Sequence, residues 1–338
     1  MFVRIFTAVL LLMLSVHVWA QPKRYSFAEP KMGSPFTIIL YANDSMQATT
    51  LARQSFSLVD SFANIFSDYL DSSELSKLSA SASMNAAPVR LSTALLEILV
   101  ASKTAFEKSG GAFDITVGPL IKLWRKARKT KVFPTKEMVL AAQQSTGFKS
   151  MVIDTINKTA TLTKPGMQLD LGGIAQGYIA QKVIDFLSAY QVSNALVNAS
   201  GDIVVSGAPP ETQGWVVGVN LPESKEELLP QKLLLQYKAV TTSGDAYQYM
   251  DHEGKRYSHI TDPRTGYGVT YQRNVTVIAA DGTTADWLAT ACSILTIKKA
   301  KRLATQMQAE VLITAFKKGR LKMYATKGFA QYFKHPQQ

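Results

Sequence analysis

Strand patterns and helical patterns follow one another in this sequence without strict alternation. In residues 45–69, apolar side chains recur every three or four positions, as the core-facing stripe of a helix requires. A second helical pattern, over residues 93–108, ends at Gly110-Gly111, where glycine can adopt the left-handed conformation that caps a helix. Strand-like runs concentrate in the second half of the chain. This order favours an α+β fold, with mixed or antiparallel sheets and packed helices, over a doubly wound fold.

The other expected elements are bounded by turn residues. We expect strands over residues 36–41, 167–170, 195–198, 215–219, 233–240, 275–280, 311–316 and 321–324, a hairpin over 153–163, and helices from the glycine-rich turn after residue 170 to 190, over 284–295 and over 298–308.

Residues 1–20 have the three parts of a secretory signal peptide. Arg4 supplies the basic start, an apolar run extends from Ile5 to Leu14, and the small residue Ala20 ends the segment. An uncleaved anchor is the alternative, but the run is shorter than the ~20 residues that a membrane span needs. No cysteine lies near the expected cleavage site, so the chain is not a lipoprotein. We therefore expect residues 21–338 to form a soluble periplasmic protein, as one large domain or two closely packed ones.

Cysteine and histidine are too scarce for several kinds of site. Cys292 is the only cysteine, which excludes an internal disulfide and any multi-cysteine metal centre. It lies in an apolar run, so we expect a buried, inert thiol. Only His252, His259 and His335 follow the signal segment, which argues against a histidine-based metal cluster.

The chain is basic, with a net charge of +12 and local clusters at residues 125–131 and 298–302. We interpret these clusters mainly as solvated faces. Export argues against a nucleic-acid partner. An anionic lipid surface or a polyphosphate ligand would suit an exported basic protein better.

Familiar nucleotide and hydrolase motifs are absent. The sequence has no G-x-G-x-x-G after a strand, no G-x-x-x-x-G-K-[ST] and no G-x-S-x-G. Glycines, acids and hydroxyl residues concentrate instead in four segments, which cover residues 110–120, 170–178, 257–266 and 283–290.

The first two segments could bring backbone close to a ligand. In the first, glycines precede Phe113, whose flat face suits a ring system, but a helix cap followed by a turn would also explain them. In the second, Asp170 precedes Gly172-Gly173 and the start of a helix. The unpaired N–H groups of a helix start can bind phosphate, and a purely structural turn is an equal alternative.

The last two segments carry side chains suited to catalysis. His259 could exchange a proton near neutral pH, and Arg264 could pair with a phosphate. Asp286 and Thr290 are four residues apart, so on a helix their oxygens share a face and could bind Mg²⁺. A surface loop, and a first-turn acid that complements a helix dipole, are the respective alternatives.

Together, these segments resemble the ApbE family of FAD:protein FMN transferases. The family signatures GAFD-x-T-x-GPL, DLGGIA-x-GY, SGD followed by H-I-x-DP-x-TG, and AD-x-x-AT occur here in the same order, and Met32-Gly33 precedes them. The likeness extends over about residues 31–295. It implies an α+β architecture related to the T-fold.

The resemblance implies an FAD site and its residues. By similarity, FAD contacts come from Met32, Tyr69, Ala112, Phe113, Asp114, Asp170, Gln176 and Ile260. Gln176 is neutral, whereas the family usually has a charged residue at this position.

The resemblance also implies a Mg²⁺ site. Its ligands would be the backbone carbonyl of Gly173 and the side chains of Asp286 and Thr290. Ala289 stands where some relatives have a further carboxylate, so the ion would keep an extra water. Ser200 stands where many relatives have glycine, a change that is tolerable if its φ is ordinary.

The reaction implied by the resemblance moves FMN from FAD to a Thr or Ser hydroxyl of an acceptor protein through a phosphoester bond, releasing AMP. Mg²⁺ would neutralise diphosphate charge, and His259 would take the hydroxyl proton. The expected acceptor is a membrane-associated electron-transfer protein. An FAD pyrophosphatase that yields FMN and AMP fits the same residues, while retention of His259, Asp286 and Thr290 argues against a non-catalytic FAD-binding protein.

Overall fold

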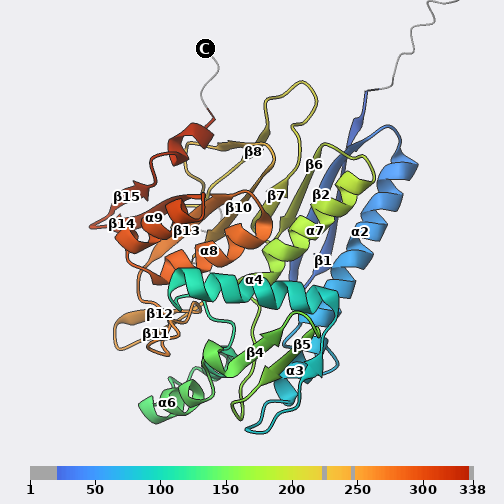
Figure 1. The fold of residues 1–338 in the computed structure, drawn as a ribbon. Coiled ribbons are helices and arrows are strands. Elements are labelled where there is room, and N and C mark those ends of the chain that lie inside the picture. The colour runs from blue at the N-terminus through green and yellow to red at the C-terminus, as the bar shows by residue number, and fades with distance from the viewer. Residues whose placement is uncertain (1–20, 223–226, 245–247, 335–338) are drawn as a thin grey trace, which may run out of the picture.

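An eight-stranded, fully antiparallel sheet forms the centre of the molecule (Figure 1). The computed structural model describes residues 21–222, 227–244 and 248–334. The strands follow the spatial order β1 (Lys23–Lys31), β2 (Ser34–Ala42), β6 (Ala195–Ala199), β7 (Asp202–Val205), β10 (Lys238–Ser243), β13 (Arg273–Ala279), β14 (Glu310–Lys317) and β15 (Arg320–Ala325).

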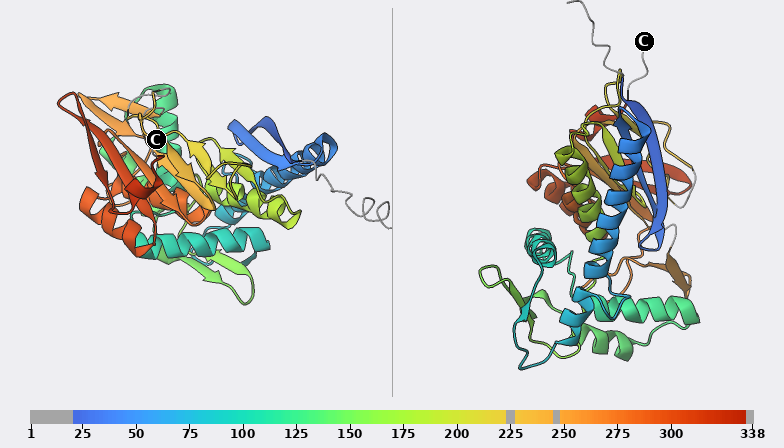
Figure 2. Two further views of the ribbon diagram at one scale, coloured as in Figure 1. Left: turned by 90° about the horizontal axis from the view of Figure 1, so that it is seen from above. Right: turned by 90° about the vertical axis from the view of Figure 1, so that its right-hand side faces the viewer.

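Four helices cover one face of this sheet, and Figure 2 shows the two layers edge-on. They are α2 (Ser45–Phe66), α7 (Ala175–Ala189), α8 (Gly282–Ile294) and α9 (Ile297–Gln306). Alternate residues of β2, namely Phe36, Ile38 and Leu40, are buried against them, as the two-residue period of a strand requires.

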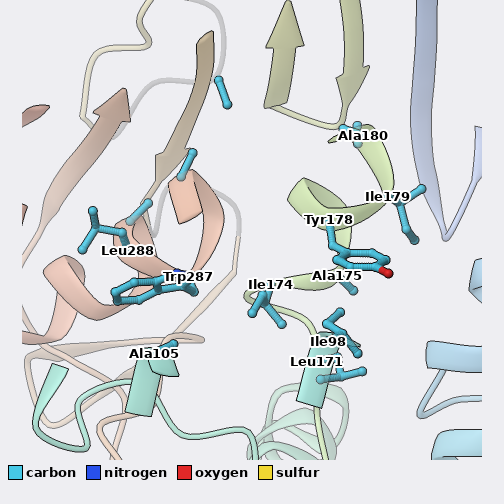
Figure 3. Packing of buried hydrophobic residues seen from close by; sticks show 14 of the residues in the cluster. Ile98, Ala105, Leu171, Ile174, Ala175, Tyr178, Ile179, Ala180, Trp287 and Leu288 are labelled. Atoms are coloured by element: carbon cyan, nitrogen blue, oxygen red, sulfur yellow. The ribbon is translucent and has the colours of Figure 1, made fainter. Parts of the chain in front are cut away.

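A fifth helix, α4 (Thr93–Ser109), packs against α8, so α8 is apolar almost all round. Figure 3 shows Trp287 and Leu288 of α8, Ile174 and Tyr178 around α7, and Ile98 of α4 in this core. Gly110 ends α4 with a φ of 61°, which confirms the predicted glycine cap.

The opposite face of the sheet is covered by a small hairpin and the C-terminal segment. Strands β8 (Trp215–Val217) and β9 (Leu233–Leu235) form the hairpin, and the 3₁₀ turn η2 (Phe329–Tyr332) packs beside it. Val205 and Val240 of the large sheet lie in this second core.

The remaining elements gather beyond one end of the sheet (Figure 1). They are α3 (Glu74–Ala80), β3 (Val89–Arg90), α5 (Gly118–Thr130), α6 (Lys136–Gln144), η1 (Phe148–Ser150), β4 (Met151–Asp154), β5 (Thr159–Leu162), β11 (Tyr249–His252) and β12 (Lys255–Ser258).

Two strand predictions are wrong. The single strand expected over 233–240 is two strands, because Tyr237 has a φ of 50° and redirects the chain from β9 to β10. Residues 167–170 are not a strand, because Gln168 forms only an isolated bridge to Val117. Helix α5 begins directly after Val117, so that segment is too short to pair with the rest of 167–170. The first long helix also ends at Phe66, so Tyr69 lies beyond it.

Other predictions are confirmed. The fold is α+β with antiparallel sheets and packed helices. Cys292 is buried, and burial raises the pKa of its thiol to about 12, which leaves it unreactive. No helix in the described ranges is long and apolar enough to cross a membrane. Residues 1–20 and His335 lie outside the described residues, as does Asp245, the acid of the SGD signature at Ser243-Gly244-Asp245.

Candidate active site

Several site segments meet at one edge of the large sheet. The β1–β2 turn at Met32-Gly33 and the β6–β7 turn at Ser200-Gly201 lie at this edge, because β2 pairs antiparallel with β6. The end of β10 at Ser243 and the start of β13 at Arg273 follow on the same edge. Segments far apart in sequence therefore surround one region.

Helices α7 and α8 cross at backbone distance beside this region. A Cβ on Gly177 would lie 2.1 Å from the carbonyl oxygen of Gly282, and one on Gly282 would lie 2.3 Å from that of Gly177. Only glycine fits at either position. The crossing fixes Asp286 of α8 against the start of α7, where its Oδ2 accepts a hydrogen bond from the Gly177 N–H at 3.0 Å.

The three predicted metal ligands share this crossing. A Cβ built on Gly173 would lie 2.9 Å from Thr290 Oγ1, so the glycine turn and α8 are in direct contact. Thr290 makes no side-chain hydrogen bond with any described residue. Asp286 is not a first-turn acid, since Asp281 caps α8 by accepting from Thr284 N, so the dipole alternative does not apply.

A second buried carboxylate, which the sequence did not assign, faces Asp286. Asp202 begins β7 and accepts a 2.7 Å hydrogen bond from Thr241 Oγ1. Burial raises the pKa of Asp202 to about 6, and burial followed by the charge of Asp202 raises the pKa of Asp286 well above its usual value. No basic side chain of the described residues neutralises the pair. Two such carboxylates beside a free hydroxyl would suit a hard cation.

The predicted flavin-binding aromatic, Phe113, also lies against the glycine turn. Phe113 is buried, its Cε2 would lie 3.3 Å from a Cβ on Gly173, and its ring packs against Trp287 at 6.3 Å between centroids. Ala112 beside it is fully buried. A ligand at the glycine turn would therefore approach both Phe113 and the metal group.

Asp114 organises the loop that carries Phe113. Its Oδ1 accepts from both the N–H and the hydroxyl of Thr116, and Thr116 Oγ1 accepts in turn from Gly147 N at 2.8 Å. Burial raises the pKa of Asp114. These bonds hold the loop together and tie it to Gly147, and the FAD contact of Asp114 stays a prediction.

Arg125 joins the glycine turn to Tyr69 and was missed by the sequence analysis. Its Nη2 donates to Asp170 Oδ2 at 2.8 Å, its Nη1 pairs with Asp68, and its guanidinium lies 4.3 Å from the centroid of the Tyr69 ring. Asp170 Oδ1 meanwhile accepts from Gly172 N at 2.8 Å. The cluster at 125–131 is therefore not wholly a solvated face. The sequence feature that could have revealed the role of Arg125 is the helix start at Gly118-Pro119, because a helix that begins there places residues 125 and 128 on one face.

His259 lies beside the same helix. Its Nδ1 lies 3.1 Å from the carbonyl oxygen of Gln248. Burial, reinforced by the charge of Arg128 and opposed by the Gln248 bond, lowers the pKa of His259 to about 4. The ring is thus neutral at neutral pH. Because a carbonyl can only accept, the proton is on Nδ1, and Nε2 is left as a proton acceptor.

Trp124 of α5 anchors the loop that follows His259. Its Nε1 donates to the carbonyl oxygen of Gly266 at 2.8 Å, and its ring stacks on Tyr257 at 6.0 Å between centroids. Arg264, proposed from sequence as a phosphate ligand, instead forms a two-pronged pair with Asp262 inside this loop.

The remaining predicted contacts border the site. Met32 has a φ of 53° in the β1–β2 turn and is 38% exposed. Gln176 Nε2 lies 3.4 Å from Ser34 Oγ, which places the start of α7 next to that turn. Ile260 is buried directly after His259.

Ser200 does not have the ordinary φ on which its tolerance depended: its φ is 59°, in the left-handed region. A non-glycine residue there costs roughly 1 kcal/mol. We expect Ser200→Gly to raise the free energy of unfolding by up to about 1 kcal/mol, partly offset by the greater chain entropy of glycine. Denaturant unfolding would measure it. Ser193→Gly, at a residue without a positive φ, should be destabilising, and equal effects of the two changes would contradict the argument.

Comparisons with known proteins find relatives over most of the chain. The "FAD:protein FMN transferase" of Klebsiella pneumoniae is 32% identical over 78% of this chain and 79% of its own, and that of Treponema pallidum is 30% identical over 83% and 81%. Among solved structures, apo flavinyl transferase ApbE of Pseudomonas stutzeri matches with a TM-score of 0.81 and 27% identity, covering 93% of this chain and 98% of that one. The flavin transferase ApbE of Vibrio cholerae gives 0.82 and 27%, over 92% and 99%. The sequence model of the ApbE family matches residues 32–313, and the chain therefore belongs to the ApbE family.

Proposed function

We propose that this protein is an FAD:protein FMN transferase that attaches FMN to a Thr or Ser hydroxyl of an acceptor protein. The observation that carries the proposal is a His259 ring held by Gln248, with Nε2 left to accept a proton, together with the oxygen donors of the glycine turn and α8. Arg125 of α5 pairs with Asp170 at the start of that turn, and the charge of Arg128 on the same helix acts on His259.

In the proposed reaction, His259 Nε2 takes the proton of the acceptor hydroxyl. The hydroxyl oxygen then forms a bond to the phosphorus of the FMN half of FAD. The bond between that phosphorus and the bridging oxygen breaks, and AMP leaves with the electron pair. His259 is suited to this role because it is neutral and its orientation is fixed by Gln248.

The oxygen donors fit Mg²⁺, which is part of the proposal. Asp286 and Thr290, with the Gly173 carbonyl, would hold the ion, and Asp202 would add negative charge beside it. No group of three or more His, Cys, Asp or Glu side chains is arranged for a metal within the described ranges. A site with so few protein ligands suits Mg²⁺, which typically keeps several of its water ligands and binds substrate phosphates. When bound, the ion would neutralise the charge that develops on the diphosphate.

The periplasm as the site of action, and a membrane-associated electron-transfer protein as acceptor, belong to the same proposal. The features of residues 1–20 support export. The acceptor would then expose its Thr or Ser on the same side of the membrane.

A mass measurement tests the proposed function. The protein without residues 1–20 is incubated with FAD, Mg²⁺ and a candidate periplasmic flavoprotein domain, and the intact mass of that domain is recorded. A gain equal to an FMN phosphoester, lost when a chelator is added, supports the transferase. AMP release without a mass gain would move the assignment to an FAD pyrophosphatase, and neither product would leave only flavin binding.

The low pKa of His259 predicts the pH at which kcat/KM falls on the acid side of its pH profile, here called the acid limb. A neutral base is required, so kcat/KM should stay level below neutral pH and fall only as the pH approaches 4. Arg128→Gln should move this limb upward, because one cause of the low pKa is removed, but not as far as 6.5, because burial is the larger cause. The pH profile of kcat/KM measures both. Arg53→Gln, at an exposed residue of α2, is the control, and an unmoved limb in Arg128→Gln would contradict the electrostatic link.

A further inference from the structure

The tip of the β14–β15 hairpin is strongly basic. Lys317, Lys318, Arg320 and Lys322, here called the basic tip, are all exposed and line one open depression. None of them forms an ion pair with a described residue. From residue 297 to 334 the chain has ten Lys and Arg and a single acid, Glu310, so this stretch supplies most of the net charge of +12.

The charges of the tip share a side with those of α9. In the register of the hairpin, Lys317 is opposite Arg320 and Lys322 is opposite Ala315, so these side chains project to the face on which Ile313 meets the core below α9. The exposed α9 residues Lys298, Lys299 and Arg302 extend the same positive surface. On the other face of the hairpin, Phe316 and Met323 are 40% and 43% exposed.

The basic tip lies at the edge of the sheet that carries the candidate active site. The pairing of Arg273 with Ala315 brings the end of β14 to the same edge as the start of β13. That edge also holds the Ser200-Gly201 turn and the end of β10. Four strand spacings separate β7 from β15, which is roughly 20 Å.

We propose that the basic tip, continued by α9, is the surface on which an acidic face of the acceptor protein docks. This inference rests on the proposed transferase function. An acceptor whose hydroxyl reaches His259 must cover this edge of the sheet, and even a domain of about 100 residues, with a radius of gyration of ≈ 13 Å, is wide enough to reach the tip at the same time. Unpaired charges at the rim of an interface act mainly by steering encounter, so the tip would speed association with an acidic partner.

Charge reversal tests the docking surface. Lys317→Glu, Lys318→Glu and Arg320→Glu are combined in one variant, and the corresponding Gln variant gives an intermediate charge. The matched control reverses the exposed Lys23, Arg24 and Arg53, which lie on β1 and on α2 beside it, at the opposite edge of the sheet from β15. The acceptors are the flavoprotein domain of the mass experiment, if its surface is acidic, and a short synthetic peptide containing only its Thr or Ser and neighbouring residues.

We expect reversal to lower kcat/KM for the domain by about tenfold or more at low salt and to remove most of its salt dependence, while the control variant behaves as wild type. The Gln variant should fall between. The KM for FAD and the rate with the peptide should not change, because neither uses the tip. Equal losses with domain and peptide would indicate a damaged site and overturn the inference.

Two further results would overturn the docking surface. One is transfer to the domain that matches wild type at every salt concentration. The other is unchanged domain kinetics together with lost binding to phosphatidylglycerol vesicles, which would assign the tip to an anionic membrane. The wild-type rate in the same assay separates the two proposals: no transfer by wild type refutes the transferase function itself, whereas normal transfer by the reversed variant refutes only the docking.

Discussion

Asp286→Asn is expected to reduce FMN transfer by about a thousandfold or more, since a metal that neutralises diphosphate charge supplies several kcal/mol of transition-state stabilisation. Asparagine keeps the oxygen that accepts from Gly177 N and removes only the charge. Asp286→Ala should lose as much activity, and it also leaves the buried Gly177 N–H without a partner. The rate of AMP release as a function of Mg²⁺ concentration measures the effect.

Stability separates this loss from misfolding. The pKa of Asp286 is raised in the folded state, so the carboxyl contributes stability below its unfolded pKa and loses it as the pH rises through the folded one. At neutral pH, which is above the unfolded pKa, burial of this carboxyl therefore opposes folding, and Asp286→Asn should be at least as stable as wild type. Asp185→Asn, at an exposed acid on α7, should leave the rate unchanged. Full metal-dependent activity of Asp286→Asn would refute the ligand assignment.

His259→Ala should reduce FMN transfer by about 10²- to 10⁴-fold, the usual contribution of a positioned general base. FAD binding should persist, because the metal group and the predicted flavin contacts other than Ile260 lie on other elements, and Ile260 itself is unchanged. Single-turnover transfer and a fluorescence titration with FAD measure the two effects separately.

His252→Ala is the matched control for the base. His252 lies on the same small hairpin, and its ring stacks on Phe133 with 3.8 Å between centroids, so its loss should affect packing and leave the transfer rate nearly unchanged. An unchanged rate in His259→Ala would remove the base assignment. Equal rate losses in both variants would show that the hairpin, and not the imidazole of His259, is what the reaction needs.

Local signals in the sequence predicted most of the large elements. The helix over 93–108 was placed within one residue, because apolar periodicity and a glycine cap are both local properties. The break at Tyr237 was missed, since a left-handed tyrosine leaves no mark on hydrophobic periodicity. The extended segment at 167–170 was mistaken for a strand because its residues suit one, although the fold gives it no partner of sufficient length.

The candidate site was predictable only where a motif carried it. Gly173, Asp286 and Thr290 were named from the resemblance, and the structure brings them together. Arg125 and its pairing with Asp170 depend on the packing of α5 against segments about fifty residues away, which spacing cannot reveal. The approach of Asp202 to Asp286 likewise arises from the sheet and α8 together.

The glycine crossing of α7 and α8 has a consequence for how the site becomes ordered. With Gly177 and Gly282 in backbone contact, the two helices cannot separate without opening the core beneath them. Amide hydrogens at this crossing should therefore exchange with solvent only in global unfolding, whereas those of the two-stranded β11–β12 hairpin should exchange through local opening. The part of the site that holds the oxygen donors Asp286 and Thr290 thus loses its conformational freedom when the chain folds. Substrate binding would need to order only the part that carries the imidazole of His259.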